Sequence, residues 1–375
     1  MLDVVVIGAG QAGLSAAYYL ARQGLRPEVD FVVLDANPAP GGAWLHRWPS
    51  LTLGAAHAVH DLPGMKLPQS DPSEPASEIV GRYYGDYEKT FGLPVHRPVK
   101  VRAVRSLVPV VPANDAGAAD ARVPGAPQNL TGQPLVVETD KGDFAAHLVI
   151  NATGTWDKPH WPHYPGVETF TGRQLHTHDF NSVAEFAGQR VLVVGGGTSA
   201  VQFLLQLAEA GVETAWSTRR PPEFTTRAFD PDWGRDVEAR VNARTAAGLP
   251  PLSVVGVTGL PLTQQYQKGI AAGTLVSRGP LAQLNAGGAV FEDESTFAAD
   301  SILWATGFRA AMDHLAPLKL REPGGGIVMD GVKVAREPRL IMVGYGASAS
   351  TLGANRAGRA AALAALDRLN VPVGV

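Results

Sequence analysis

The sequence contains no cysteine among its 375 residues. This absence excludes disulfide scaffolds, thiolate nucleophiles, iron–sulfur clusters and zinc sites built on cysteine. It also excludes any redox reaction that passes electrons through a cysteine pair of the protein itself.

A strong charge imbalance and long apolar segments are missing as well. Lys and Arg number 32 against 35 Asp and Glu, so the net charge is −3 and favours neither nucleic acid nor an anionic membrane as partner. No apolar run approaches the ~18 residues that a bilayer-spanning helix needs. The N-terminus lacks the basic start of a signal sequence, and Asp3 stands in its place. We therefore expect a cytoplasmic protein without membrane or nucleic-acid partners.

The hydrophobic content is 45%, which is ample for large cores. A chain of this length exceeds one typical core, so two domains are expected.

A glycine-rich turn, GAGQAG, occupies residues 8–13 directly after an apolar run that predicts a buried strand over 2–7. A helical pattern follows it, which is the context required of a dinucleotide-binding turn. Gly8 permits the tight bend, Gly10 lets the backbone approach a pyrophosphate, and Gly13 lets helix and strand pack closely. The pyrophosphate is expected at the positive N-terminal end of that helix.

The next predicted strand, over 31–34, ends at Asp35. A carboxylate at this strand end can accept hydrogen bonds from ribose hydroxyls. The alternative is a glycine-rich turn that binds nothing, but the strand, helix and terminal acid all favour a nucleotide site.

A second glycine-rich turn, GGGTSA, occupies residues 195–200 between a strand predicted over 191–194 and a helix predicted over 199–210. Ala200 in the third small-residue place is an accepted variant of the motif. The cofactor contacts predicted here are Gly195, Gly197, Thr198 and Ser199.

The strand predicted over 212–217 leads to Arg219 and Arg220 instead of an acid. Two guanidinium groups suit a 2′-phosphate, which a carboxylate would repel, so NADPH is favoured over NADH. The alternative is a solvated surface turn, since arginine pairs are common on protein surfaces.

Two Ala-Thr-Gly tripeptides, at 152–154 and 305–307, each follow an apolar strand and are interpreted as the two crossings between domains. The fold class predicted is α/β, with two Rossmann-like dinucleotide-binding domains, the second inserted into the first. The first domain would comprise 1–155 and 300–375, and the second 156–299.

Other apolar patterns complete the expected order of elements. They predict a helix over 74–90, strands over 99–111, 135–139, 144–150, 289–291, 301–304 and 340–343, and a C-terminal helix over 353–369. The Ala-, Gly- and Pro-rich segment 112–134 is interpreted as a surface insertion, and 221–287 as irregular.

Residues 170–180, FTGRQLHTHDF, fit the pattern F-x-G-x-x-x-H-x-x-x-[FYW] at every fixed place, through Phe170, Gly172, His176 and Phe180. This stretch resembles the fingerprint of class B flavoprotein monooxygenases, which include flavin-containing monooxygenases, YUCCA enzymes and Baeyer–Villiger monooxygenases. Further segments resemble that family: Gly41-Gly42-Ala43-Trp44 near the flavin, the two Ala-Thr-Gly hinges with Gly154 and Gly307, and Val343-Gly344-Tyr345-Gly346 as a closing flavin contact.

The resemblance implies FAD in the first domain and NADPH in the inserted one, with O2 and a small molecule as substrates. NADPH would reduce the flavin, and reduced flavin would form a C4a-(hydro)peroxyflavin that oxygenates a sulfide, an amine or a ketone. The family also suggests a homodimer. The alternative is an NAD(P)H-dependent flavin reductase or oxidase that oxygenates nothing, and a second alternative is a non-catalytic nucleotide-sensing module.

No motif for covalent catalysis is present, and no side chain is assigned a catalytic role. The histidine pairs His57/His60, His160/His163 and His176/His178 are interpreted as ordinary histidines, because two ligands at such spacing do not make a metal site. Substrate contacts are expected from 45–65 and from 221–287.

Overall fold

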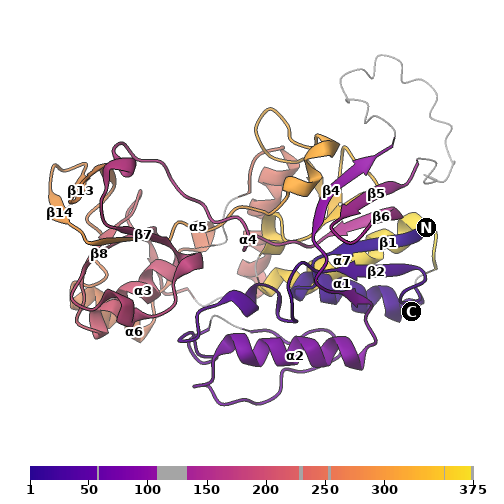
Figure 1. Cartoon of the computed structure of the whole chain (residues 1–375), viewed down its shortest axis with the longest axis horizontal. Helices are drawn as coiled ribbons and strands as arrows, with labels where there is room; N and C mark the ends of the chain where they lie inside the picture. The colour runs from indigo at the N-terminus through magenta and orange to yellow at the C-terminus, as the bar shows by residue number, and fades with distance from the viewer. Residues whose placement is uncertain (57–58, 108–132, 228–230, 252–254, 350, 373–375) are drawn as a thin grey trace.

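The structure is a computed structural model, which describes residues 1–56, 59–107, 133–227, 231–251, 255–349 and 351–372. Figure 1 shows two lobes, each with its own β-sheet and its own helices. The predicted class, an α/β protein with two Rossmann-like units, is confirmed.

The larger lobe contains a sheet with the order β16-β17-β18-β6-β1-β2-β3, extended by the antiparallel strands β4 and β5 along one half of β6. Its central strands β18, β6, β1, β2 and β3 run parallel. The bounds are β1 (Leu2–Ile7), β2 (Phe31–Leu34), β3 (Val95–His96), β4 (Val101–Ser106), β5 (Leu135–Thr139), β6 (Phe144–Asn151), β16 (Met329–Asp330), β17 (Lys333–Val334) and β18 (Leu340–Met342).

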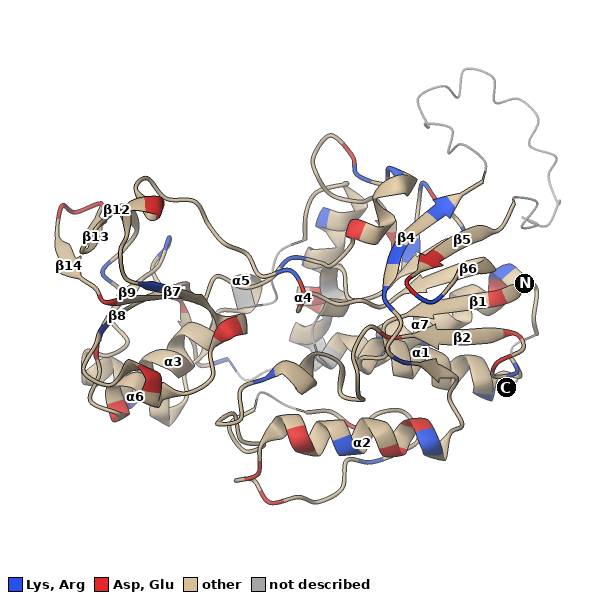
Figure 2. Cartoon of the chain, in the orientation of Figure 1, with Lys and Arg blue, Asp and Glu red and all other residues tan. Residues whose placement is uncertain are grey.

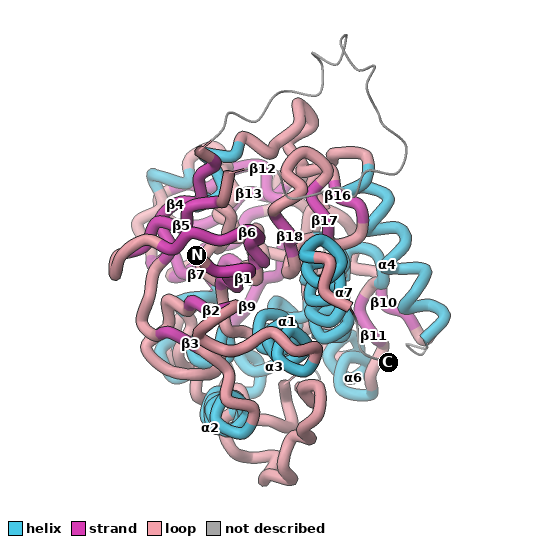
Figure 3. The backbone as a smooth tube through the Cα atoms, turned by 90° about the vertical axis from the view of Figure 1, so that its right-hand side faces the viewer, coloured by secondary structure: helices cyan, strands magenta, loops and turns pink. Residues whose placement is uncertain are grey.

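Two helices far apart in sequence, α1 (Gln11–Arg22) and α7 (Thr351–Leu369), lie side by side against this sheet (Figure 3). Their close approach depends on small residues, since a Cβ at Gly358 would lie 2.6 Å from the carbonyl oxygen of Ala12. Helix α2 (Ala76–Thr90) carries charges of both signs along its length (Figure 2), while its tyrosines are buried. The hydroxyls of Tyr83 and Tyr87 donate to the carbonyls of Met65 and Pro63 and so hold the loop before α2.

The smaller lobe contains the all-parallel sheet β7-β15-β8-β9 and the antiparallel sheet β12-β13-β14. Helices α3 and α6 belong to this lobe (Figure 1). Phe203 of α3 belongs to one buried core cluster with Phe186 and Trp216. In chain order, the elements from β7 to β15, α4 among them, have the bounds β7 (Arg173–His176), β8 (Arg190–Val194), α3 (Thr198–Glu209), β9 (Glu213–Ser217), β10 (Phe224–Thr225), α4 (Pro231–Ala246), α5 (Val255–Thr258), β11 (Leu260–Pro261), α6 (Gln264–Ala271), β12 (Leu281–Asn285), β13 (Gly288–Phe291), β14 (Thr296–Ala298) and β15 (Ser301–Trp304).

Short 3-10 helices connect these elements. They are η1 (Gly42–His46), η3 (Val167–Thr169), η4 (Thr177–Asp179), η5 (Val183–Phe186), η6 (Asp313–Leu318) and η7 (Gly346–Ala349). Among the residues that the structure describes, no helix has the length and apolar character needed to cross a membrane.

The interpretation of 221–287 as irregular is wrong, because α4, α5, α6 and β12 lie within it. Helix α4 has the sequence PDWGRDVEARVNARTA, and its buried residues Trp233, Val237 and Val241 stand at i, i+4 and i+8, a short helical stripe among mostly polar residues that the sequence interpretation missed. The insertion predicted at 112–134 falls on residues outside the described part of the chain, except for its last two.

The domain limits expected from the sequence stay a prediction, and two observations bear on them. Strand β15 pairs with β7 and β8, whereas the limit expected at 299/300 assigns its residues to the first domain. Helix α4 contacts η7 and β16 of the larger lobe, and Arg356 of α7 forms an ion pair with Glu238 of α4. We propose, on this basis, that the second limit lies at 304/305 and that α4 belongs with the larger lobe.

Candidate nucleotide sites and their junction

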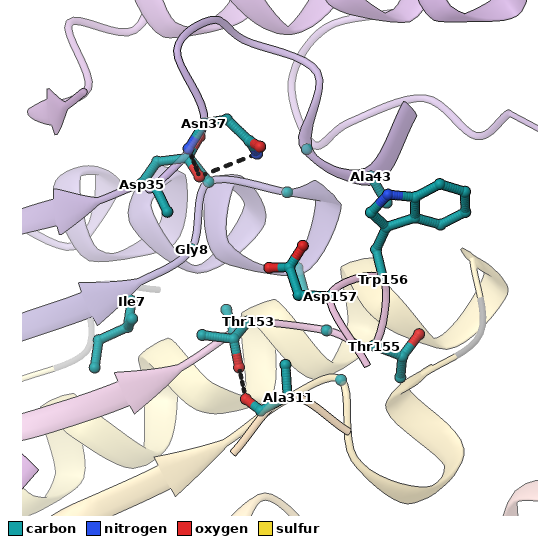
Figure 4. Close-up of a pocket in the computed structure, with 18 of the residues that line it drawn as sticks. Ile7, Gly8, Asp35, Asn37, Ala43, Thr153, Thr155, Trp156, Asp157 and Ala311 are labelled. Atoms are coloured by element: carbon teal, nitrogen blue, oxygen red, sulfur yellow. Dashed lines mark hydrogen bonds between the residues drawn. The ribbon is translucent and has the colours of Figure 1, made fainter. Parts of the chain in front are cut away.

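The larger lobe has a cavity of about 710 Å³ at the carboxyl ends of its parallel strands. It is bordered by the first glycine turn, by η1, by the segment after β6 and by the turn after β18 (Figure 4). The predicted site residues that line it are Gly8, Gly10, Asp35, Gly42, Trp44, Gly154 and Gly344.

The three turn glycines have different surroundings. Gly8 has a φ of +101°, and a Cβ there would lie 2.6 Å from the carbonyl oxygen of Ala152. A Cβ at Gly13, behind the turn, would lie 1.9 Å from the carbonyl oxygen of Gly8. A Cβ at Gly10 would have no described atom within 4 Å, so Gly10 faces open cavity.

Helix α1 begins immediately after Gly10, and within the described chain no side chain caps this end. Backbone N–H groups at an uncapped helix start, together with the helix dipole, attract a phosphate. Gly42 lies against the same turn, since its Cβ would be 2.8 Å from the Cα of Gly10. This cradle fits the pyrophosphate of a dinucleotide.

Asp35 is 4% exposed at the end of β2, and its Oδ2 accepts a hydrogen bond of 2.7 Å from Nε of Arg97. Arg97 also donates twice to Glu88, both times at 2.7 Å. Burial alone would lower the pKa of Arg97, but its ion pairs with Glu88 and Asp35 raise it overall. The other oxygen, Oδ1, has only contacts of 3.3 and 3.4 Å with Asn37 (Figure 4) and is therefore the better acceptor for a ribose hydroxyl.

The second glycine turn repeats the geometry of the first. Gly195 has a φ of +136°, and a Cβ there would lie 2.1 Å from the carbonyl oxygen of Ala305. A Cβ at Gly197 would meet no described atom within 4 Å, and α3 begins directly after it. Thr198 and Ser199, both partly buried, form the first turn of α3. Each glycine turn therefore rests on the alanine carbonyl of one Ala-Thr-Gly tripeptide.

Arg219 and Arg220 are exposed just beyond β9. The pKa of His160 is lowered mainly by burial, and further by the positive charges of Arg309 and Arg219. Arg309 and Arg219 therefore both act on His160, although 90 positions separate them in the chain. The sequence offered no signal for this apart from the nearness of Arg309 to the second Ala-Thr-Gly.

The fingerprint segment runs along β7 of the smaller lobe, and its His176 contacts the second Ala-Thr-Gly tripeptide. His176 is 0% exposed, its Nε2 lies 3.0 Å from the carbonyl oxygen of Gly307, and its Nδ1 accepts from the backbone N–H of His178 at 3.1 Å. These partners place the ring proton on Nε2. Burial lowers the pKa of His176 to about 4, so the ring is neutral.

The other fingerprint residues lie at a close backbone contact or in the hydrophobic core of the smaller lobe. A Cβ at Gly172 would lie 2.4 Å from the carbonyl oxygen of Asp300, so this close approach requires glycine. Phe170 is buried in the core of the smaller lobe beneath β13. Phe180 packs on Phe203 of α3 with 4.4 Å between ring centroids.

The hinge glycines have left-handed backbones, with φ of +64° at Gly154 and +78° at Gly307. Gly344 also has a positive φ of +75°, and a Cβ there would lie 3.2 Å from the Cα of Gly154. The first hinge and the turn after β18 therefore pack backbone against backbone at the cavity wall.

The segment from Trp44 to Trp48 connects the lobes. Trp44 lines the cavity, whereas Trp48 is 3% exposed and packs on Phe180 and Phe203 of the smaller lobe. Between them Arg47 lies over Trp156, with its guanidinium carbon 4.3 Å from the ring centroid. Arg47 was not singled out from the sequence, because a single arginine in an aperiodic loop carries no pattern.

Two further polar groups lie at the cavity. His314 lines it, with Nε2 2.7 Å from Oδ1 of Asn151, and burial lowers its pKa to about 4. Thr153 donates to the carbonyl oxygen of Ala311 at 2.6 Å (Figure 4). Across the described residues, no three His, Asp or Glu side chains are grouped to hold a metal ion, and His57 falls outside them.

Comparison with known proteins gives a family match and near full-length relatives. Residues 2–344 match the pyridine nucleotide-disulphide oxidoreductase family. A flavin-containing monooxygenase from Stenotrophomonas maltophilia has a similar structure, with a TM-score of 0.77, 33% identity, and coverage of 97% of this chain and 98% of that one. An uncharacterized oxidoreductase, CzcO of Bacillus subtilis, is 25% identical over 82% of both chains. The indole-3-pyruvate monooxygenase YUCCA1 of Oryza sativa subsp. japonica is 28% identical over 57% of this chain and 47% of its own length.

Proposed function

The chain belongs to the pyridine nucleotide-disulphide oxidoreductase family and is a flavin-dependent monooxygenase. We propose that it uses FAD and NADPH to oxygenate a sulfide, an amine or a ketone. The observation that carries this proposal is the repeated geometry of two glycine turns, each resting on an Ala-Thr-Gly tripeptide.

We assign FAD to the cavity of the larger lobe. The start of α1 at Gly10 would hold the pyrophosphate, and Oδ1 of Asp35 would accept from the ribose. Gly42, Trp44, Gly154 and Gly344 would border the rest of the dinucleotide, since they line the remaining cavity wall.

NADPH is assigned to the start of α3. The N–H groups after Gly197, with Thr198 and Ser199, would hold its pyrophosphate. Arg219 and Arg220 would bind the 2′-phosphate, because planar guanidinium groups match phosphate oxygens.

Bound flavin supplies hydride acceptance and oxygen activation, and the side chains supply position and shelter. Trp44 and Trp156 form apolar walls of the cavity and limit the entry of water. His176 stays neutral and donates to Gly307, which holds the fingerprint segment against the second hinge. No described side chain needs to act as a nucleophile in this scheme.

The competing function is a reductase or oxidase that uses the same turns but oxygenates nothing. Steady-state turnover with NADPH tests both, if NADPH, O2, hydrogen peroxide and product are measured together against a panel of sulfides, amines and ketones. We expect one oxygenated product per NADPH with a suitable substrate. Hydrogen peroxide equal to the NADPH consumed, with no oxygenated product from any of the three classes, would refute oxygenation.

The homodimer and the cytoplasmic location expected from the sequence stay predictions. Size-exclusion chromatography with light scattering measures the first directly.

A further inference from the structure

Arg47 is a cation without a counter-ion at the junction of the two lobes. It lines the cavity, and no carboxylate of the described residues lies within 4.0 Å of its guanidinium nitrogens. The described chain also offers its guanidinium no hydrogen-bond acceptor. Its surroundings are three indole rings, at 4.3 Å for Trp156 and 5.9 Å for both Trp44 and Trp48.

Two of these indoles add unused donors. The Nε1 atoms of Trp48 and Trp156 are buried and have no hydrogen-bond partner among the described residues. A buried donor without an acceptor costs about 1–3 kcal/mol. Arg47 and Trp156, which both line the cavity, are therefore donors without an acceptor, and the charge of the guanidinium favours an acceptor that is an anion.

Burial is the sole influence that shifts the pKa of Arg47, which falls to about 10. The side chain is still charged at neutral pH. Cation–π contacts with Trp156 and its neighbours offset part of the cost of burying that charge.

The position of Arg47 argues against a nucleotide phosphate as the anion that would pair with it. The phosphates of both nucleotides have their own sites at the uncapped starts of α1 and α3. Trp48 ties the Arg47 segment to Phe180 and Phe203 of the smaller lobe, and Trp156 stacks on Phe308 just beyond the second hinge. Arg47 thus lies between the lobes, where a substrate must meet the reactive rings.

We propose that Arg47 is the receptor for the carboxylate of a small organic anion, so that the substrates of this enzyme carry a negative charge. The part of this inference that calls the anion a substrate rests on the proposed function. The binding site itself can be tested without turnover.

Benzoate and its neutral isostere benzamide are the probes, titrated by calorimetry into the flavin-loaded, oxidised protein. Benzoate should bind at least ~10-fold more tightly than benzamide, and Arg47→Gln should remove most of that difference while changing benzamide affinity less than ~2-fold. Arg105→Gln is the matched control, because Arg105 is exposed and pairs with Glu138 outside the cavity. It should leave both affinities unchanged.

Several results would overturn the proposal. The first is equal affinity of the wild-type protein for benzoate and benzamide. The second is an equal loss of benzoate affinity and benzamide affinity in Arg47→Gln, which would make Arg47 a packing residue. The third is loss of bound FAD or NADP⁺ in Arg47→Gln with unchanged benzoate preference, which would assign the arginine to a nucleotide.

If Arg47→Gln fails to fold, Arg47→Lys retains the charge and should keep a weaker benzoate preference. Raising the ionic strength of the solution should weaken the binding of benzoate to the wild-type protein and leave the binding of benzamide unchanged. An equal effect on the two affinities would contradict the inference. Binding of benzoate by a protein that oxygenates nothing would leave this site intact and refute only the proposed function.

Discussion

His176 donates from Nε2 to the carbonyl oxygen of Gly307 at 3.0 Å, which ties the fingerprint segment to the second Ala-Thr-Gly hinge. Both partners have a second contact, since Nδ1 of His176 accepts from the backbone N–H of His178 and the Gly307 carbonyl also accepts from the backbone N–H of His160 at 2.9 Å. The histidine of the fingerprint therefore acts as a fixed connector between β7 and the turn after β15.

This connection predicts the effects of two substitutions. His176→Ala removes the acceptor of the His178 N–H and leaves the Gly307 carbonyl with the His160 N–H as its donor. Together with the cavity left by the buried ring, this should cost about 2–4 kcal/mol in unfolding free energy. His176→Gln keeps a donor and should lose less than half as much. Urea denaturation measures both, and equal losses would show that volume and not the hydrogen bond matters.

The same residue predicts a pH dependence. The pKa of His176 is about 4 in the folded protein and about 6.5 when unfolded, so the unfolded chain binds the extra proton between these values. The contribution of His176 to the free energy of unfolding should therefore be greatest above pH ~6.5 and decrease toward pH ~4 by on the order of 3 kcal/mol. His176→Gln should flatten the profile of unfolding free energy between these limits, and an unchanged slope would contradict the assignment.

The first glycine turn predicts different outcomes for neighbouring glycines. Gly13→Ala places a Cβ 1.9 Å from a backbone oxygen and should destabilise the fold by several kcal/mol. Gly10→Ala meets no described atom, so the apoprotein should keep its melting temperature while FAD affinity falls ~10-fold or more. Thermal unfolding without flavin and flavin titration separate the two. A Gly10→Ala protein that binds FAD normally would remove the pyrophosphate from this turn.

The arginine pair predicts the choice of nicotinamide. Replacing both Arg219 and Arg220 by Ala should raise the KM for NADPH ~10- to 100-fold and leave the KM for NADH nearly unchanged, because only NADPH carries the 2′-phosphate. Arg173→Ala is the control, since Arg173 pairs with Glu185 on the surface. Equal changes for the two nucleotides would exclude the pair from the phosphate site.

The first hinge predicts a kinetic effect. Gly154 has a φ of +64°, which a β-branched residue adopts only under strain, so Gly154→Val should slow NADPH turnover. Gly142→Val introduces similar strain at a φ of +113° in the surface turn after β5 and is the matched control. Stopped-flow reduction of the flavin gives the rate, and a Gly154→Val rate equal to that of the control would refute the hinge.

Much of the framework followed from local pattern. The strands predicted over 2–7, 31–34 and 301–304 are confirmed with the same bounds, because each has a core of consecutive apolar residues. Both glycine turns stand at the starts of α1 and α3, as their motifs predicted.

What the sequence could not provide was contact across distance. Helix α4 has a polar sequence and forms against η7 and β16, which are far away in the chain. The partner of Asp35 is Arg97, and the aromatic surroundings of Arg47 come partly from Trp156. No spacing rule connects such pairs, because the fold alone brings them together.

The C-terminal strand β18 pairs with the second half of β6, and α7 packs along α1. On the ribosome, β1, α1 and β6 therefore emerge before β18 and α7, which later cover one edge of β6 and one side of α1. The smaller lobe, from β7 to β15, is complete in sequence before that closure occurs. Removing α7 would thus expose a side of α1, a helix synthesised long before it.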